Sequence, residues 1–379
     1  MLLRRGSVII VLLGAVALNV WFLRSNGTDG IAAGISFALV CLCSSWALTA
    51  VKSTGGLRVV KRAKAGVIET APSAPTGEIV RNPILNAFTI DLEDYFHTEV
   101  ASRAVMYRDW DKMPSRIESS VHRLLDLLDE SNTRATVFVL GWVAKKRPWL
   151  IREVVRRGHE IGCHSLKHRM VNKLTPATFL EDTRVAKQII EDATGVVVEG
   201  YRAPSFSITP GTEWAFKVLE QLGFSYDSSV HPVWHMSYAN TSAPRFPYYA
   251  DGTSVLEIPI ATWRACGMNF PVGGGAYLRL LPYRYVRFGL SVVNEKEWQP
   301  VTLYVHPWEI DYLQPAIHAG WSSHVRQIWG TRTMEAKLRL LLSNMRFGPI
   351  SQVYAQSLSV NPVVYSTSTQ RTPSFAQVS

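Results

Sequence analysis

Residues 88–94 read Phe88-Thr89-Ile90-Asp91-Leu92-Glu93-Asp94, an apolar strand-like run that ends in three carboxylates. A second segment, His164-Ser165-Leu166-Lys167-His168, carries two histidines four positions apart. Imidazole nitrogens and carboxylate oxygens bind zinc and other divalent ions, and hydrolytic sites keep further positions open for water and substrate. A remaining acid beside the ion is a ready general base, so the two segments together indicate hydrolysis of an amide or ester. Acidic clusters also cap turns and paired histidines also occur by chance, so neither segment is sufficient alone.

The chain after residue 85 alternates strand-like and helix-like segments. Pro176 begins one predicted helix, and Gly158 and Gly195 follow the ends of two, which are usual positions for these residues. Strands alternating with helices favour an α/β fold with a parallel sheet and helices packed outside it. The predicted strands are 85–90, 135–140, 159–164, 196–201 and 224–226, and the predicted helices are 117–129, 148–157, 176–194, 212–222 and 334–345.

Polar residues follow these predicted strands directly. In barrels of alternating strands and helices, catalytic side chains come from the C-terminal ends of several strands. We therefore expect one site to collect the side chains of Asp91, His164, Arg202, Asp227 and His306.

The sequence loses this regularity after about residue 232. The triple glycine Gly273-Gly274-Gly275 is not followed by Lys-Ser or Lys-Thr, and no helix-opening pattern fits it. A tightly turned or mobile loop is therefore favoured over a phosphate-binding loop. From Ser357 the sequence is rich in Ser, Thr, Gln, Val and Pro, and we expect a disordered tail over residues 349–379.

Two apolar stretches, residues 2–23 and 31–51, are each close to the ~20 residues that a membrane-spanning helix needs. Arg4 and Arg5 precede the first stretch, and five Lys or Arg residues follow the second between positions 52 and 64. The positive-inside rule predicts a transmembrane hairpin within residues 1–53 and a linker at 54–84. The following domain would then lie on the cytoplasmic face of a bacterial inner membrane. A signal peptide followed by one anchor is the alternative, and it would place the domain in the periplasm.

The net charge of +10 lies partly in the basic segment beside these stretches, where anionic lipid is the expected partner. Nucleic acid is not expected, because the chain carries no basic-aromatic stripe or known nucleic-acid module. Of the four cysteines, only Cys163 and Cys266 lie outside the apolar stretches. The sequence therefore implies no disulfide framework.

Five ordered motifs resemble those of the polysaccharide deacetylases, the NodB homology domains of carbohydrate esterase family 4. Residues 91–97, 273–283 and 306–311 look closer to one branch, the deacetylases associated with exosortase-linked exopolysaccharide gene clusters. The resemblance implies a distorted (β/α) barrel over residues 85–348, with a family-specific extension from about 232. The five motifs are residues 88–94, 134–141, 158–164 with His168, 201–205, and 305–306.

The resemblance implies that His164 and His168 bind a metal together with an acid of the first motif. Leu92 stands where common members have a second aspartate, so Glu93 or Asp94 has to replace that ligand. Glu93 is favoured because residues two apart on a strand face the same side, and Asp94 remains the alternative. Zinc is the expected metal, and the ligand set also suits cobalt or nickel.

Four further roles follow from the resemblance. Asp91 matches the catalytic base, and Arg202 matches the arginine that orients it. The backbone N–H of Ser205 would face the developing oxyanion. His306 would protonate the leaving amine, and Asp227 would orient His306. Exposed aromatic rings stack well on sugars, so Tyr95, Trp234 and Trp308 are candidate substrate-binding residues.

These features predict a membrane-tethered, metal-dependent N-deacetylase. Its substrate would be an N-acetylhexosamine in an exopolysaccharide or in a lipid-linked oligosaccharide precursor, and other exopolysaccharide biosynthesis proteins are possible partners. One alternative is a metal-dependent amidohydrolase of a small amide or cyclic imide. Another is a non-catalytic glycan-binding protein, which would require a broken site, whereas every motif position here holds a chemically competent residue.

Overall fold

The computed structural model describes residues 83–234, 240–317 and 327–359. The two apolar stretches and the linker up to residue 82 lie outside these ranges. Among the helices within them, none is long and apolar enough to cross a membrane.

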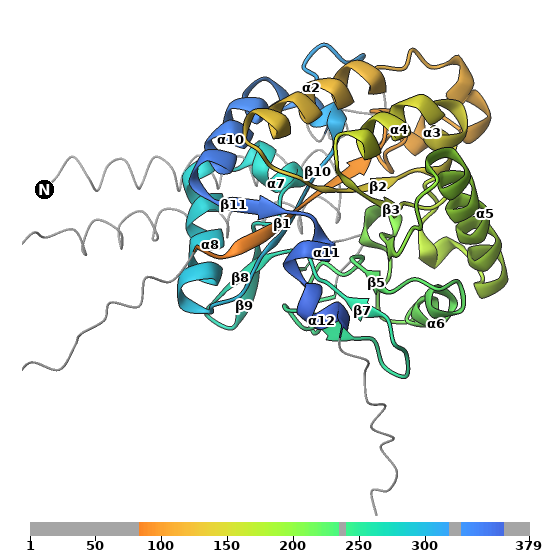
Figure 1. Ribbon diagram of the computed structural model, residues 1–379. Coiled ribbons are helices and arrows are strands. Elements are labelled where there is room, and N and C mark those ends of the chain that lie inside the picture. Colours follow the sequence, from red (N-terminus) through yellow and green to blue (C-terminus); the bar gives the residue numbers. More distant parts are fainter. Residues whose placement is uncertain (1–82, 235–239, 318–326, 360–379) are drawn as a thin grey trace, which may run out of the picture. The chain divides into compact units, whose positions relative to one another are not determined.

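A nine-stranded sheet forms the centre of the described domain, in the order β10-β1-β2-β3-β4-β5-β7-β6 with β11 beside β1 (Figure 1). Every pair in it is parallel except β6 with β7. The strands are β1 (Leu85–Leu92), β2 (Thr136–Val139), β3 (Glu160–Cys163), β4 (Gly200–Tyr201), β5 (Tyr226–Asp227), β6 (Tyr248–Tyr249), β7 (Leu256–Glu257), β10 (Thr302–Val305) and β11 (Arg346–Gly348).

Backbone hydrogen bonds bring the two ends of this sheet together. The chain that leaves β7 donates from Ala261 N to Thr302 O of β10, at 3.0 Å. Tyr304 N of β10 donates in turn to Gly273 O, at 2.7 Å. The sheet is therefore curved, and the carboxyl ends of its parallel strands face a common centre.

Helices surround the sheet, as Figure 1 shows, and the predicted α/β fold is confirmed. Each helix and strand predicted from the sequence is present, with bounds that differ by a few residues at most. The helices are α2 (Ile117–Glu130), α3 (Gly141–Lys146), α4 (Pro148–Arg156), α5 (Pro176–Thr194), α6 (Trp214–Gln221), α7 (Gly275–Leu280), α8 (Tyr283–Lys296), α10 (Thr331–Asn344), α11 (Ile350–Val353) and α12 (Ala355–Ser359).

The region after residue 232 is more regular than its sequence indicates. A hairpin of β8 (Thr262–Ala265) and β9 (Met268–Pro271) leads into the triple glycine. Gly274 has φ +109° and lies so close to β10 that a Cβ atom there would be 2.0 Å from Tyr304 O. Helix α7 then begins directly at Gly275, so the expectation that no helix opens here was wrong. The helix has six residues and no side-chain cap, which leaves it without the usual sequence signals of a helix start.

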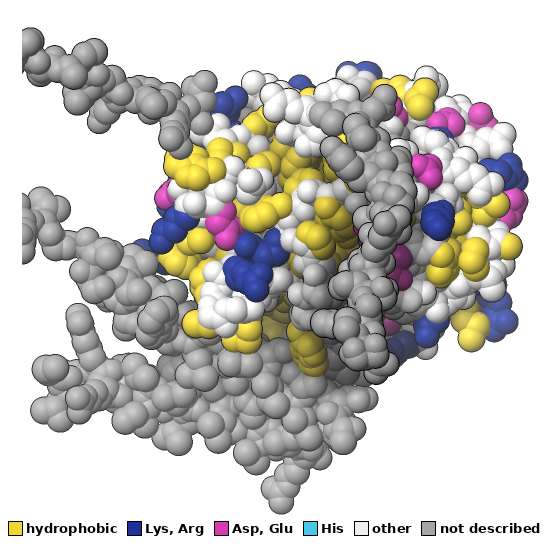
Figure 2. Space-filling model, turned by 90° about the horizontal axis from the view of Figure 1, so that it is seen from below, with side chains coloured by type: hydrophobic (Ala, Val, Ile, Leu, Met, Phe, Trp, Pro, Cys, Tyr) yellow, Lys and Arg dark blue, Asp and Glu magenta, His cyan; other side chains and the backbone are white. Residues whose placement is uncertain are grey.

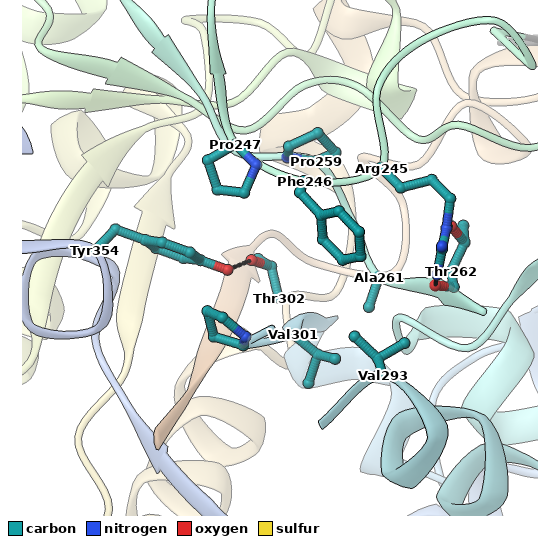
Figure 3. Close-up of a pocket in the computed structure, with 11 residues that line it drawn as sticks. Arg245, Phe246, Pro247, Pro259, Ala261, Thr262, Val293, Val301, Thr302 and Tyr354 are labelled. Carbon is teal, nitrogen blue, oxygen red and sulfur yellow. Dashed lines mark hydrogen bonds between the residues drawn. The ribbon is translucent and has the colours of Figure 1, made fainter. Parts of the chain in front are cut away.

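The expected disordered tail, residues 349–379, was wrong for its first eleven residues. Helices α11 and α12 form there, and Ile350 is fully buried. Figure 3 shows the Tyr354 ring directed at Thr302, with a hydrogen bond of 2.9 Å between the two hydroxyl oxygens. Thr302 begins β10, so this contact lies at the amino end of the strand, away from His306 at its carboxyl end. Residues 360–379 lie outside the described part of the chain.

Hydrophobic side chains and Lys or Arg side chains share one face of the described domain (Figure 2). Among the large exposed residues, Trp234 and Trp298 are about half exposed, at 51% and 53%, and Trp329 is 66% exposed. Single exposed hydrophobic residues are common on protein surfaces and do not by themselves define a binding site.

Candidate active site

The carboxyl ends of the parallel strands carry the predicted site residues. Asp91 is the penultimate residue of β1, and His164 directly follows β3. Arg202 follows β4, and His306 follows β10. Because β1 pairs with both β10 and β2, Asp91 lies near the middle of this arrangement. The sequence expectation that these side chains meet at one edge of the sheet is met for these four.

Glu93, His164 and His168 form a group that could hold a metal ion. Each offers one ligand atom, and these atoms all lie within 4.8 Å of one another. His168 Nε2 is 2.9 Å from Glu93 Oε2, and both side chains are nearly inaccessible to solvent. The backbone carbonyl of Arg202 lies 2.8 Å from His164 Nδ1, which leaves Nε2 of that ring available.

The protonation of these groups suits a cation. Burial lowers the pKa of His164 to about 4, so its imidazole is neutral near pH 7 and has a lone pair to donate. Burial alone would raise the pKa of Glu93, but the charges of His168, His306 and His164 and a hydrogen bond from His168 hold it well below its usual value. A buried carboxylate flanked by two imidazoles is the donor set that zinc and similar ions bind.

Asp94 is not part of this group, so the alternative ligand assignment was wrong. Its carboxylate accepts hydrogen bonds from Tyr95 N at 3.0 Å, Ser115 Oγ at 2.6 Å and Arg116 N at 3.0 Å. These contacts tie the loop after β1 to the chain before α2. Asp94 therefore organises the loop, whereas Glu93 lies with the histidines.

Asp91 is held by a buried arginine. The Arg202 guanidinium has no solvent exposure and its Nη1 lies 2.7 Å from Asp91 Oδ1. The same nitrogen donates to Thr89 Oγ1 at 2.7 Å, while Nε donates to Ser228 O at 3.0 Å. The second oxygen of Asp91 is 3.9 Å from His306 Nε2. One carboxylate oxygen is thus fixed and the other faces the candidate general acid.

The acid partner of His306 is Glu309, and the prediction that Asp227 fills this role was wrong. His306 Nδ1 and Glu309 Oε2 are 3.1 Å apart, and the same oxygen accepts from His306 N. Glu309 is fully buried, and Arg279 Nε donates to its other oxygen at 3.1 Å. Sequence reasoning missed both residues. The signal was an acid three positions after His306, because that spacing lets a side chain return to the first residue of a turn.

The charge on His306 follows from these contacts. Burial lowers its pKa, but the hydrogen bond to Glu309 and the negative charges of Glu309, Glu93 and Asp91 outweigh burial and raise it to about 9. His306 Nε2 lies 3.4 Å from Glu93 Oε1, so the protonated ring faces the candidate metal group. A histidine that stays protonated near neutral pH is suited to donate a proton.

Asp227 lies instead at the carboxyl end of β5, fully buried, where it accepts hydrogen bonds from the backbone and side chain of Ser229. Ser205 lies on the turn after β4 in the left-handed region, with φ +54°, and Phe206 follows with φ +52°. Two successive residues of this kind turn the backbone sharply beside Arg202.

The three aromatic residues predicted to bind substrate have different positions. Trp308 lies in the site, where its ring stacks on His306 at 5.0 Å and its Nε1 donates to Glu93 Oε1 at 3.3 Å. Tyr95 is fully buried and donates to Pro114 O, so its assignment as a sugar platform was wrong. Trp234 is half exposed and immediately precedes residues 235–239, which lie outside the described ranges.

Two family models match adjacent parts of the chain. The model described as Polysaccharide deacetylase matches residues 99–226. The model described as Domain of unknown function (DUF3473) matches residues 228–355. The site residues after β10 therefore fall in the second match.

Curated proteins align with the first part. YheN of Bacillus subtilis is 29% identical over 124 residues, which are 32% of this chain and 42% of YheN. The peptidoglycan-N-acetylglucosamine deacetylase of Bacillus cereus is 25% identical over 125 residues, 32% of this chain and 54% of that protein. The chain thus spans about half the length of these relatives.

Among solved structures, the peptidoglycan deacetylase PdaC of Bacillus subtilis is 15% identical, with a TM-score of 0.38, over 73% of this chain and 92% of PdaC.

Residues 99–226 match the deacetylase model and align with a named deacetylase, and we conclude that this part of the chain is a polysaccharide deacetylase domain of the NodB type.

Proposed function

We propose that the domain is a metal-dependent N-deacetylase that hydrolyses the acetamide group of an N-acetylhexosamine. One observation carries the proposal: a buried Glu93–His164–His168 group lies beside an Asp91 held by Arg202 and a His306 held by Glu309. A metal-ligand set, a base and an acid are the groups that hydrolysis of an amide requires.

Glu93, His164 and His168 would hold the ion. When bound, a divalent ion there would polarise the acetyl carbonyl and make water easier to deprotonate. The fit rests on the neutral His164 imidazole, on the ionised Glu93, and on the absence of any hydrogen-bond donor to Glu93 Oε2 other than His168 among the described residues.

The chain's own groups would move the protons. Asp91, oriented by Arg202, would take a proton from the attacking water, and the C–N bond would break to leave acetate. The amine nitrogen needs a proton to leave, and His306 would supply it from Nε2, the nitrogen that faces Asp91 and Glu93. Glu309 and Arg279 keep the ring oriented and charged. The backbone N–H of Ser205 would stabilise negative charge on the carbonyl oxygen.

The substrate we propose is a polysaccharide or its lipid-linked precursor. The Bacillus cereus relative is named for N-acetylglucosamine in peptidoglycan, which supports an N-acetylhexosamine as the substrate class. Motifs of the exosortase-associated branch favour an exopolysaccharide. Two N-terminal apolar stretches favour a tether to the inner membrane, beside other biosynthesis proteins that act on the same chain.

The first prediction concerns the metal. Replacing both His164 and His168 with Ala should remove bound zinc, because both nitrogen ligands are lost. Glu93→Ala should lose more zinc than Asp94→Ala. The Asp94 variant should instead lose about 1–3 kcal/mol of stability, since three hydrogen bonds lose their acceptor. Elemental analysis of the purified protein measures the zinc, and thermal unfolding measures the stability. Full occupancy in the double histidine variant would contradict the ligand assignment.

The second prediction tests the reaction. The protein should release acetate from N-acetylglucosamine oligomers, and a chelator should stop the release. Asp91→Asn keeps the shape of the side chain but removes the proton acceptor, so it should retain zinc and lose about 100- to 10,000-fold in rate. Normal turnover in this variant would exclude Asp91 as the base. Zinc-loaded wild-type protein with no acetate release from any N-acetylated glycan would contradict the function itself.

The third prediction separates Glu309 from Asp227. The Glu309 carboxylate raises the pKa of His306, and the acid form is the active one, so activity should fall as pH rises through that pKa. Glu309→Gln removes the negative charge, lowers the pKa, and should move this loss of activity to lower pH. Asp227→Asn should leave its position unchanged. A pH–rate profile of each variant decides, and the reverse result would restore Asp227 as the partner.

The fourth prediction concerns the membrane. Basic residues on both outer flanks of the apolar stretches favour a domain on the cytoplasmic face. A fluorescent protein fused after Lys64 should therefore fluoresce, and an alkaline phosphatase fused there should be inactive. An active phosphatase with no fluorescence would place the domain outside the inner membrane and make the finished polymer the substrate.

A further inference from the structure

Asp227 and Glu257 form a pair of acids buried beneath the site. They are register partners on the adjacent strands β5 and β7, and neither has any solvent exposure. Ser229 N lies 3.0 Å from Asp227 Oδ2 and 3.4 Å from Glu257 Oε2, so the two carboxyl groups are neighbours and can share a hydrogen bond. A carboxylate can only accept, so a hydrogen bond between two carboxyl groups requires that one of them carries a proton.

The contacts indicate which acid is protonated. Asp227 accepts from Ser229 Oγ at 2.7 Å and from Ser229 N at 3.0 Å, one bond on each oxygen. Glu257 accepts one short bond, from Val230 N to Oε1 at 3.0 Å, and its Oε2 has only a 3.4 Å contact with Ser229 N. Burial raises the pKa of both acids, and that of Glu257 lies well above its usual value because the Asp227 charge adds to burial. Of the two acids, Glu257 is therefore the one suited to carry the shared proton.

The pair is connected to the turn that carries Ser205. Ser229 has one hydroxyl hydrogen and donates it to Asp227, so its oxygen is left to accept, and Ala203 N donates to it at 2.7 Å. Ala203 follows Arg202 and lies two residues before Ser205.

The neighbouring serine holds Arg202 from the same segment. Arg202 Nη2 donates to Ser228 Oγ at 2.8 Å and its Nε donates to Ser228 O at 3.0 Å. Ser228 Oγ donates in turn to Ile258 O, next to Glu257. Residues 227–230 thus connect the acid pair on β5 and β7 with Arg202, which holds Asp91, and with the turn that follows Arg202.

We propose that Glu257 is a positioning residue: in its protonated form it donates to Asp227, and the ionised Asp227 orients Ser229 so that Ala203 and the turn to Ser205 are held in place. The catalytic consequence rests on the proposed deacetylase function, whereas the structural consequence does not. Among the described residues, Glu257 makes no hydrogen bond or ion pair with the candidate metal group or with His306, so it acts only through this chain of hydrogen bonds.

Glutamine provides the decisive substitution. In Glu257→Gln the amide nitrogen can donate to Asp227 and the amide oxygen can still accept from Val230 N, so the chain of contacts is preserved without a titrating group. Glu257→Ala removes both contacts. Ser229→Ala leaves both acids in place and removes the hydroxyl that donates to Asp227 and accepts from Ala203 N. Glu309→Gln is the matched control for Glu257→Gln. It makes the same exchange at another fully buried glutamate, but there it removes a negative charge that keeps His306 protonated.

Two measurements on the full-length zinc-loaded protein test the proposal. Hydrogen–deuterium exchange of peptides covering residues 200–207 reports the turn directly and needs no activity. Steady-state acetate release from N-acetylglucosamine oligomers gives kcat and KM. Glu257→Gln should match wild type in exchange and keep most of its kcat. Glu257→Ala and Ser229→Ala should exchange faster in 200–207, keep their zinc, and lose about tenfold or more in kcat with little change in KM.

The outcomes separate the two proposals. If Glu257→Gln is as damaged as Glu257→Ala, the donated hydrogen bond is not the operative feature and the positioning role is wrong. Unchanged exchange and kcat in Ser229→Ala would also overturn it, and this variant decides if Glu257→Ala does not fold. If wild type releases no acetate but exchange in 200–207 responds as expected, the proposed function fails while the positioning role of Glu257 stands.

Discussion

A fully buried guanidinium governs the geometry of this site. A charge removed from water is costly unless it is paired and hydrogen-bonded, and Arg202 satisfies this condition with groups from two other strands. Thr89 and Asp91 come from β1, the guanidinium itself follows β4, and Ser228 follows β5. Its carbon also lies 4.2 Å from the centre of the Phe138 ring on β2. These contacts tie β1 to the segments after β4 and β5, so they fix the position of Asp91 relative to the rest of the site.

The sequence could predict those parts of the site that depend on strand ends and on the alternation of side chains along a strand. Side-chain alternation favoured Glu93 as the acid on the same side as Asp91, and His164 follows a predicted strand, so alternation and strand ends were enough to bring them together. In the structure Glu93 lies just after β1, and its backbone N donates to Asp91 O at 3.0 Å. Glu309 was missed because its role depends on a short turn after β10 and on Arg279, thirty residues earlier. Asp227 was misassigned because its partner Glu257 becomes its neighbour only through the register of β5 with β7.

Aromatic residues near the metal group illustrate a second limit. Tyr95 and His97 follow the acidic motif directly, and aromatic rings beside a sugar-processing site are natural candidates for stacking. In the fold the His97 ring packs 4.3 Å from Trp110 and 5.0 Å from Trp142, and its Nδ1 accepts from Asp94 N. These rings fill the space behind the loop that holds Glu93. Sequence identifies such residues as important to the region, but burial decides whether they contact substrate or support the groups that do.

The charges around the site favour a bound cation. Asp91, Glu93 and Glu309 contribute three negative charges and the buried Asp227 beneath them a fourth, whereas Arg202, Arg279 and protonated His306 contribute three positive ones. His164 is neutral and adds a lone pair without charge. A divalent ion beside Glu93 would therefore leave the buried site with net positive charge. Hydrolysis of an amide develops negative charge on oxygen, and a buried positive site stabilises that charge more strongly than water does, because the surrounding dielectric is low.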